Sequence, residues 1–178
     1  MNLALKQLTD IAISQVGVHE EGGNNNGSKI REFQQATWLK PDSWAWCAAY
    51  VDWCLREWLH ESEDACNALS IKTASEVDSW RCKDASAFGI TKWAIKKGLY
   101  VTDEKEQALA GDIVVFDFSH CGIIIADQLP GKNYIETVEG NTNGKGLRDS
   151  LNGDGVWLKE RKTNLVRNYI RIIKENIA

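Results

Sequence analysis

Apolar residues in the first half of the chain recur three and four positions apart, which is the spacing of amphipathic helices. This spacing predicts helices over residues 3–15, over residues 28–36, from Cys47 onward, and through residues 93–97. A loop rich in Gly and Asn, residues 21–27, separates the first two. Asp84 or Ser86 is suited to cap the last helix, and Gly98 to end it.

The second half of the chain instead contains short runs of β-branched and aromatic residues bounded by turn residues. These runs predict strands over residues 113–118, 120–126, 133–139, 156–162 and 165–173. Helices followed by an antiparallel sheet are the segregated order of an α+β domain. The 178 residues suit a single domain, and we find no internal repeat or low-complexity tail that would indicate a second one.

The pairing of the second and third predicted strands can be estimated from the turn residues between them. If Ala126 faces Asn133 across this connection, His120 stands directly opposite Glu139. Side chains opposed in this way have Cβ atoms about 5 Å apart. Gly122 lies two positions along on the same face, where it would leave room for a substrate or for the helix that bears Cys47.

Cys47 stands at the head of its predicted helix, on the apolar stripe that continues through Val51, Cys54, Leu55 and Trp58. In the first turn, unpaired backbone N–H groups and the positive end of the helix dipole favour a thiolate over a thiol. Cys54 lies two turns further in and is expected to be core. Cys121 is also expected to be core, because strand alternation points it to the face opposite His120.

Two later segments supply the groups that a thiol nucleophile needs. His120 is the expected base, Glu139 is expected to orient its ring, and Asn141 is given a supporting role. Each residue also has an ordinary interpretation, since a cysteine on an apolar stripe is most often core and a histidine at a strand end can be structural. The combination favours a cysteine enzyme over either.

Composition limits the remaining alternatives. With 21 basic and 25 acidic side chains the formal charge is −4, which argues against nucleic acid as the main partner. Five cysteines without a CxxC pair indicate reduced thiols, although Cys66 and Cys82 could pair in an oxidising space. Asp149, Asn152 and Asp154 miss the alternating spacing of a calcium loop. We therefore expect no metal and no cofactor.

At the residues that carry this chemistry the chain resembles the CHAP family, papain-like cysteine and histidine-dependent amidohydrolases and peptidases that cut bacterial peptidoglycan. The matching segments are WCAAYVDWC, AGDIVVF with SHCGIIIAD, and VEGNTN. The family's order of a cysteine, a histidine and then a Glu or Asn implies catalytic roles for Cys47, His120, Glu139 and Asn141. The flanking segments extend the resemblance over nearly the whole chain, except for residues 61–84, which look like an insertion.

This resemblance implies one CHAP-like catalytic domain over residues 1–178, with no separate wall-binding domain. Eight tryptophans are many for this length, and four of them lie around the Cys47 segment: Trp38, Trp44, Trp46 and Trp53. They predict either a packed aromatic wall or a cleft floor that stacks on sugar rings or a peptide stem. In the second interpretation Trp44, Trp46 and Gly122 contact substrate.

The implied function is cleavage of an amide bond in peptidoglycan, most simply by a monomeric phage endolysin. Two alternatives stay open: a secreted antibacterial amidase effector with an immunity partner, and a non-catalytic binding domain on the same fold. The first residues show neither a leader pattern nor a run of about 20 apolar residues. We therefore expect synthesis in the host cytoplasm, no membrane insertion, and delivery to the wall through a separate export or holin system.

Overall fold

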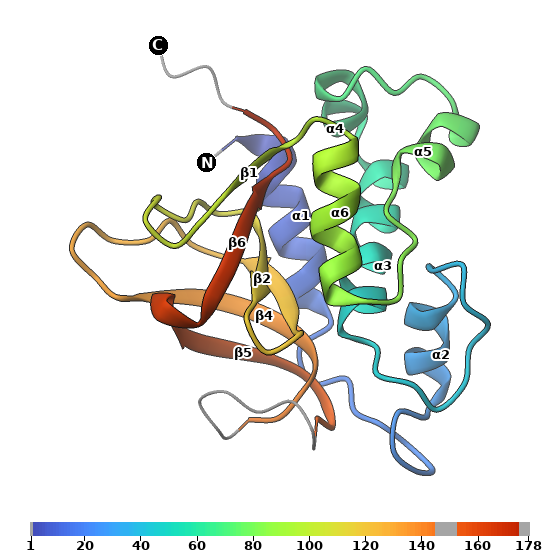
Figure 1. The fold of residues 1–178 in the computed structure, drawn as a ribbon. Coiled ribbons are helices and arrows are strands. Elements are labelled where there is room, and N and C mark those ends of the chain that lie inside the picture. Colours follow the sequence, from blue (N-terminus) through green and yellow to red (C-terminus); the bar gives the residue numbers. More distant parts are fainter. Residues whose placement is uncertain (1, 145–152, 175–178) are drawn as a thin grey trace.

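The structure, a computed structural model, describes residues 2–144 and 153–174 (Figure 1). Over these residues it is an α+β fold in which six α-helices precede a six-stranded sheet. The helices are α1 Leu3–Ser14, α2 Ser28–Gln34, α3 Cys47–Glu61, α4 Glu63–Ala68, α5 Ala74–Trp80 and α6 Ala87–Lys96. The strands are β1 Tyr100–Thr102, β2 Ile113–Phe116, β3 Cys121–Ile124, β4 Tyr134–Thr142, β5 Gly155–Lys162 and β6 Val166–Arg171.

The predicted helices are confirmed, with small changes at their ends. The helix predicted at Cys47 begins on that residue. Ser86 caps α6 by accepting a hydrogen bond from Gly89 N, and Gly98 follows the helix with a φ of +71°. Of the possible calcium-loop residues, Asp149 and Asn152 lie outside the described residues, and Asp154 accepts a hydrogen bond from Trp157 Nε1.

Helix α3 is buried on more sides than its single apolar stripe predicts. Trp53 and Asp52 lie off the stripe, yet both are buried. The segment between α3 and α6 supplies the reason. It forms α4 and α5, which were not predicted, and Arg81 at the end of α5 pairs with Asp52 at 2.8 Å. The apparent insertion at residues 61–84 therefore covers α3.

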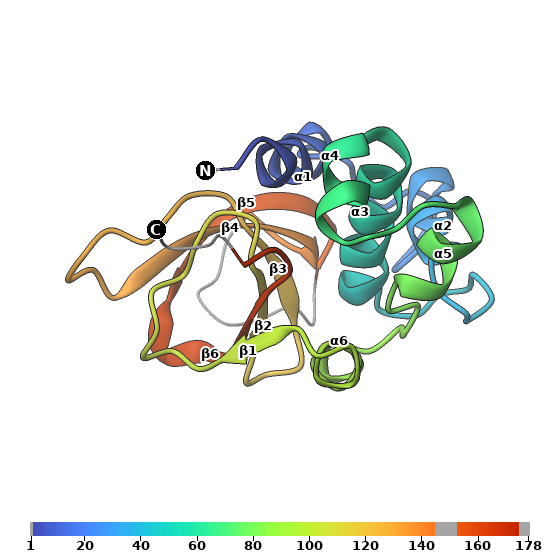
Figure 2. The same ribbon diagram turned by 90° about the horizontal axis from the view of Figure 1, so that it is seen from above.

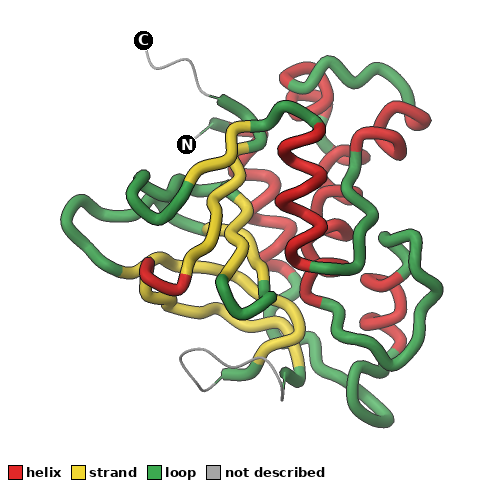
Figure 3. The backbone as a smooth tube through the Cα atoms, viewed as in Figure 1, coloured by secondary structure: helices red, strands yellow, loops and turns green. Residues whose placement is uncertain are grey.

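The sheet has the order β1-β6-β2-β3-β4-β5 with antiparallel neighbours. Viewed from above it curls strongly, and α1, α3 and α6 lie along its outer face (Figure 2). Coloured by secondary structure, the strands and helices form two adjacent layers (Figure 3). Strand β1 was not predicted because it contains only three residues. Among the described residues, no helix is long and apolar enough to cross a bilayer.

The predicted register between β3 and β4 is wrong by two residues. Ile123 pairs with Val138, so Glu139 lies opposite Gly122 instead of His120. The connection between β3 and β4 is not a tight hairpin, because its first residues hydrogen-bond the segment before β2. Asp127 accepts a hydrogen bond from Ala110 N. A shift of two residues keeps every side chain on its expected face, so Glu139 still lies on the face expected for His120.

Two hydrophobic clusters occupy the two faces of the sheet. The larger cluster joins α3 to outward-facing strand residues such as Cys121 and Val138. The smaller lies inside the curl and includes Phe116 and Ile135. The candidate site lies between the N-terminus of α3 and the turn that joins β2 to β3.

Candidate active site

Cys47 is the first residue of α3, and only 7% of its surface is exposed. The first hydrogen bond of this end of the helix runs from Tyr50 N to Trp46 O. The N–H groups of Cys47, Ala48 and Ala49 therefore precede the helix's own pairing, and that of Ala48 hydrogen-bonds the Cys47 sulfur. This placement agrees with the position predicted for a reactive thiol.

His120 lies in the turn before β3, where its ring is fully buried. Ser119 has a φ of +61°, and Phe116 N donates to the His120 carbonyl at 2.8 Å, so the backbone of this turn is closely held. The ring stacks near Phe116 and Phe118, with centroids 6.0 and 5.8 Å away. Its Nε2 lies 2.8 Å from Glu139 Oε2, whereas Nδ1 has no hydrogen-bond partner.

The pKa of the Cys47 thiol lies well below its usual range. A hydrogen bond with Cys121 contributes most to lowering this pKa; burial opposes it, and His120 and Ala48 N–H add to the lowering. The pKa of the Cys121 thiol rises, first through burial and then through Cys47. Cys121 is core as predicted, but its sulfur faces Cys47, because the outer face of β3 is the face on which α3 packs. It was not expected in the site.

His120 and Cys47 stabilise each other's charged forms. Burial lowers the pKa of His120, but its interactions with Cys47 and Glu139 outweigh burial and raise this pKa to about 9. Glu139 shows the opposite balance: burial raises its pKa, while Arg161 and then His120 lower it to about 2. At neutral pH the geometry therefore favours a thiolate, an imidazolium and a carboxylate in series.

Arg161 is a second site residue that the sequence did not predict. Its Nε donates to Glu139 Oε1 at 2.9 Å and its Nη2 donates to Glu139 Oε2 at 2.5 Å, with both side chains buried. Thr137 Oγ1 donates to Glu139 Oε1 at 2.7 Å. Strand alternation puts Arg161 on the same face of β5 as Trp157. This signal alone does not predict burial, because a basic residue in a strand usually faces solvent.

Asn141 does not contact His120 in any described hydrogen bond. A bulge between Glu139 and Thr142 gives Asn141 a φ of +56° and turns its amide toward α3. One end of this amide lies 3.1 Å from Trp46 N and 3.0 Å from Trp46 Nε1, and also 2.6 Å from Asn25 Oδ1. The Trp46 backbone N–H at this atom requires oxygen there, and Asn25 must then turn its own amide nitrogen toward it, so Asn141 holds the residue before Cys47.

Three residues were expected to contact substrate, and two of them instead make contacts within the protein. Trp46 is fully buried, stacks on Phe33 with centroids 5.6 Å apart and donates to Glu20 Oε1, so the structure contradicts a substrate-facing role. The space predicted at Gly122 is filled by Glu139: a Cβ there would lie 2.7 Å from Glu139 Cγ. Trp44 is half-buried and donates to Lys40 O; its contact with substrate stays a prediction.

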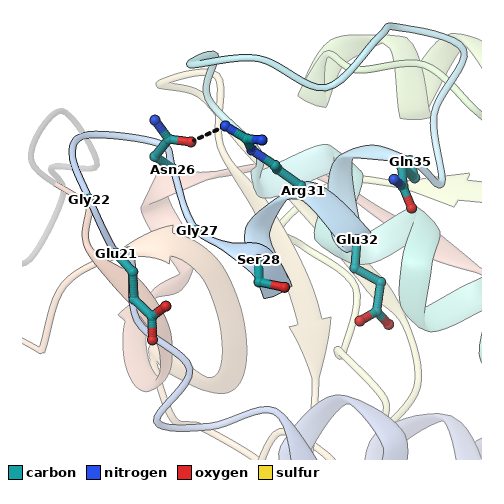
Figure 4. Close-up of a pocket in the computed structure, with 8 residues that line it drawn as sticks. All are labelled: Glu21, Gly22, Asn26, Gly27, Ser28, Arg31, Glu32 and Gln35. Atoms are coloured by element: carbon teal, nitrogen blue, oxygen red, sulfur yellow. Dashed lines mark hydrogen bonds between the residues drawn. The ribbon is translucent and has the colours of Figure 1, made fainter.

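A cavity of about 750 Å³ lies beside α2, apart from the thiol (Figure 4). It is lined by polar residues of the Gly/Asn loop and of α2, and Arg31 crosses it to Asn26 at 3.1 Å. Cys47, His120 and Glu139 do not line it. Within residues 2–144 and 153–174, no three His, Cys, Asp or Glu side chains gather as metal ligands.

Comparison with known proteins adds no relative. No family model matches the chain, and neither the curated proteins nor the solved structures contain a match.

Proposed function

We propose that the chain is a papain-like cysteine hydrolase that cleaves an amide bond in bacterial peptidoglycan. One observation carries the proposal. Cys47, at the N-terminus of α3, and His120 each shift the pKa of the other toward its charged form, and His120 Nε2 lies 2.8 Å from Glu139 Oε2. A nucleophile, a base and a group that orients the base are the parts of a cysteine hydrolase.

The chemistry follows from this order. The Cys47 thiolate attacks the carbonyl carbon, and the negative oxygen of the intermediate accepts a hydrogen bond from the Cys47 backbone N–H. His120 then gives its proton to the leaving amine, and a thioester remains on Cys47. His120 next removes a proton from water, which attacks the thioester and restores the thiolate as the acid product leaves.

Peptidoglycan as the substrate is supported by the CHAP-like motifs at the nucleophile helix, the histidine strand and the acidic residue. The same motifs support an endolysin role. The buried network around His120 favours an enzyme over a non-catalytic binding domain, since binding alone does not require an activated thiol.

The test is digestion of purified peptidoglycan by the wild-type protein, by Cys47→Ala and by Cys54→Ala. Mass spectrometry of the products distinguishes new amino groups, expected from amide cleavage, from new reducing sugar ends. Wild type and Cys54→Ala should release the same fragments, and Cys47→Ala none. Cleavage by Cys47→Ala, or sugar ends as the only products, contradicts the proposal. Equal binding of wild type and Cys47→Ala to intact wall without any cleavage supports the binding-domain alternative.

A further inference from the structure

We propose that Arg161 is a positioning residue that makes the charge-separated form of Cys47 and His120 the electrically neutral state of the buried site. This inference concerns the site used in the proposed function, and it depends on that function only for the identity of the reacting thiol. It begins from the contacts that Arg161 makes with Glu139.

Both Arg161 and Glu139 are buried from solvent, and two hydrogen bonds at 2.9 and 2.5 Å join them. The guanidinium also lies over two aromatic rings, 5.5 Å from the Phe116 centroid and 5.6 Å from the Phe118 centroid. The same two rings stack near His120. Arg161 is therefore part of the wall that surrounds the imidazole, and it contacts the carboxylate on which the imidazole depends.

The charges of the site can be counted over the residues that the structure describes. A Cys47 thiolate and a Glu139 carboxylate are balanced by a His120 imidazolium and the Arg161 guanidinium. Without Arg161 the same state would leave one uncompensated negative charge among buried groups, which is costly. Protonation of Cys47 would remove that charge. Loss of Arg161 should therefore favour the thiol, although Arg161 does not touch the sulfur in any described contact.

The other groups near the site do not replace this charge. Cys121 faces Cys47 from β3 as a neutral thiol. Thr137 supplies only a neutral hydrogen bond to Glu139. Lys159 lies on the same face of β5 as Arg161, but its Nζ donates to Asn143 O at 2.7 Å and its side chain is partly exposed. Within residues 2–144 and 153–174, the second buried cation of the site is therefore Arg161.

The test measures the rate at which iodoacetamide alkylates Cys47 as a function of pH, with the labelled residue identified by mass spectrometry. The proteins are wild type, Arg161→Lys, Arg161→Met and the double variant Arg161→Met with Glu139→Gln. Arg161→Met should move the titration of Cys47 upward by about one pH unit or more, giving about tenfold slower labelling at neutral pH. Arg161→Lys, which keeps the charge, should move it less.

The double variant separates charge balance from simple damage to the fold. Removing Arg161 and Glu139 together restores equal numbers of positive and negative charges, so its titration should return toward that of wild type. Replacing both members of a buried pair is tolerated far better than removing one, so this protein keeps the test informative if Arg161→Met does not fold. In that case the double variant should titrate within about one pH unit of wild type.

The inference is wrong if folded Arg161→Met labels like wild type, or if the double variant titrates no nearer to wild type than Arg161→Met does. A double variant displaced by much more than one unit also overturns it when Arg161→Met cannot be measured. Labelling needs no substrate. A wild-type protein that cleaves no peptidoglycan but shows these shifts would therefore contradict the proposed function and leave the role of Arg161 supported.

Discussion

Gly122 lies opposite Glu139 in the sheet, and its missing side chain is what allows the carboxylate to reach His120. A Cβ at position 122 would stand 2.7 Å from Glu139 Cγ and 2.8 Å from the Val138 carbonyl oxygen, closer than real contacts permit. The side chain of Glu139 would have to move. The 2.8 Å contact between Glu139 and His120 therefore depends on the absence of a side chain at Gly122.

Gly122→Ala is expected to lower turnover at least about tenfold and to destabilise the fold by about 1–3 kcal/mol, as overpacked cores do. Thermal unfolding and hydrolysis rates check this together. Ile123→Val is the matched control: it changes the next residue of β3, on the other face, and should cost about 0.5–1.5 kcal/mol with turnover nearly intact. Equal turnover in wild type and Gly122→Ala would show that the contact is not needed.

Cys47 should be the cysteine that iodoacetamide labels fastest, although it is largely buried. Its pKa is lowered, whereas burial raises the pKa of Cys54 and that of Cys82, which reaches about 12. Peptide mapping after brief labelling at neutral pH measures the order. Cys66, which is partly exposed, is the internal comparison. Faster labelling of Cys66 than of Cys47 would count against an activated nucleophile.

Hydrolysis and labelling should differ at high pH. Labelling needs only the thiolate, so its rate should rise as Cys47 loses its proton and then stay level. Hydrolysis also needs the proton on His120, whose pKa is raised to about 9, so kcat/KM should fall as pH passes about 9. The two profiles report the Cys47–His120 pair as a unit. If hydrolysis and labelling have the same pH dependence above pH 9, His120 is not the acid that protonates the leaving amine.

Glu139→Gln is expected to lower turnover at least about tenfold with little change in KM, because the carboxylate stabilises the imidazolium. It also leaves Arg161 buried without its anion, which should cost about 3–5 kcal/mol, so rates must be measured well below the unfolding temperature. Asn141→Ala should instead loosen Trp46 and reduce turnover less. A larger loss for Asn141→Ala than for Glu139→Gln would exchange the two roles.

Acid should weaken the fold partly through Glu139. Its pKa is lowered to about 2 from 4.5, so the unfolded chain binds more protons between these values. The stabilisation is complete above about pH 4.5 and is lost as pH falls toward 2, a difference on the order of 3 kcal/mol. Denaturant titrations at several pH values measure the free energy of unfolding. Between pH 4.5 and 2 it should fall less in the double variant Glu139→Gln with Arg161→Met than in wild type. An equal fall in the two proteins would contradict the lowered pKa of Glu139.

The sequence predicted the long elements well, because periodicity reports which face of an element is buried. The helix that begins at Cys47 and the strands around His120 and Glu139 are present as expected. Even the wrong register kept Glu139 on the right face, since the shift was of two residues. Periodicity could not say that α5 would cover Asp52, because that burial depends on Arg81, distant along the chain.

Arg161 and Cys121 show where the local pattern fails. A basic residue in a strand looks like part of a solvated face, whereas the side chain of Arg161 is buried against Glu139. Cys121 was assigned to the correct face, but that face could not be identified as the one on which Cys47 packs. Both relationships arise from packing between segments far apart in sequence, which local residue preferences do not encode.

The cluster at Cys47 draws on α3, the turn before β3, β4 and β5, and Arg161 comes from the second-last strand. During synthesis, a chain that has emerged only through α3 has neither the histidine nor the cation that favour the thiolate. Its cysteine is then an ordinary thiol with a pKa of about 8.5. Because pairings between distant segments form late, the reactive sulfur would appear only after β5 has left the ribosome and paired with β4.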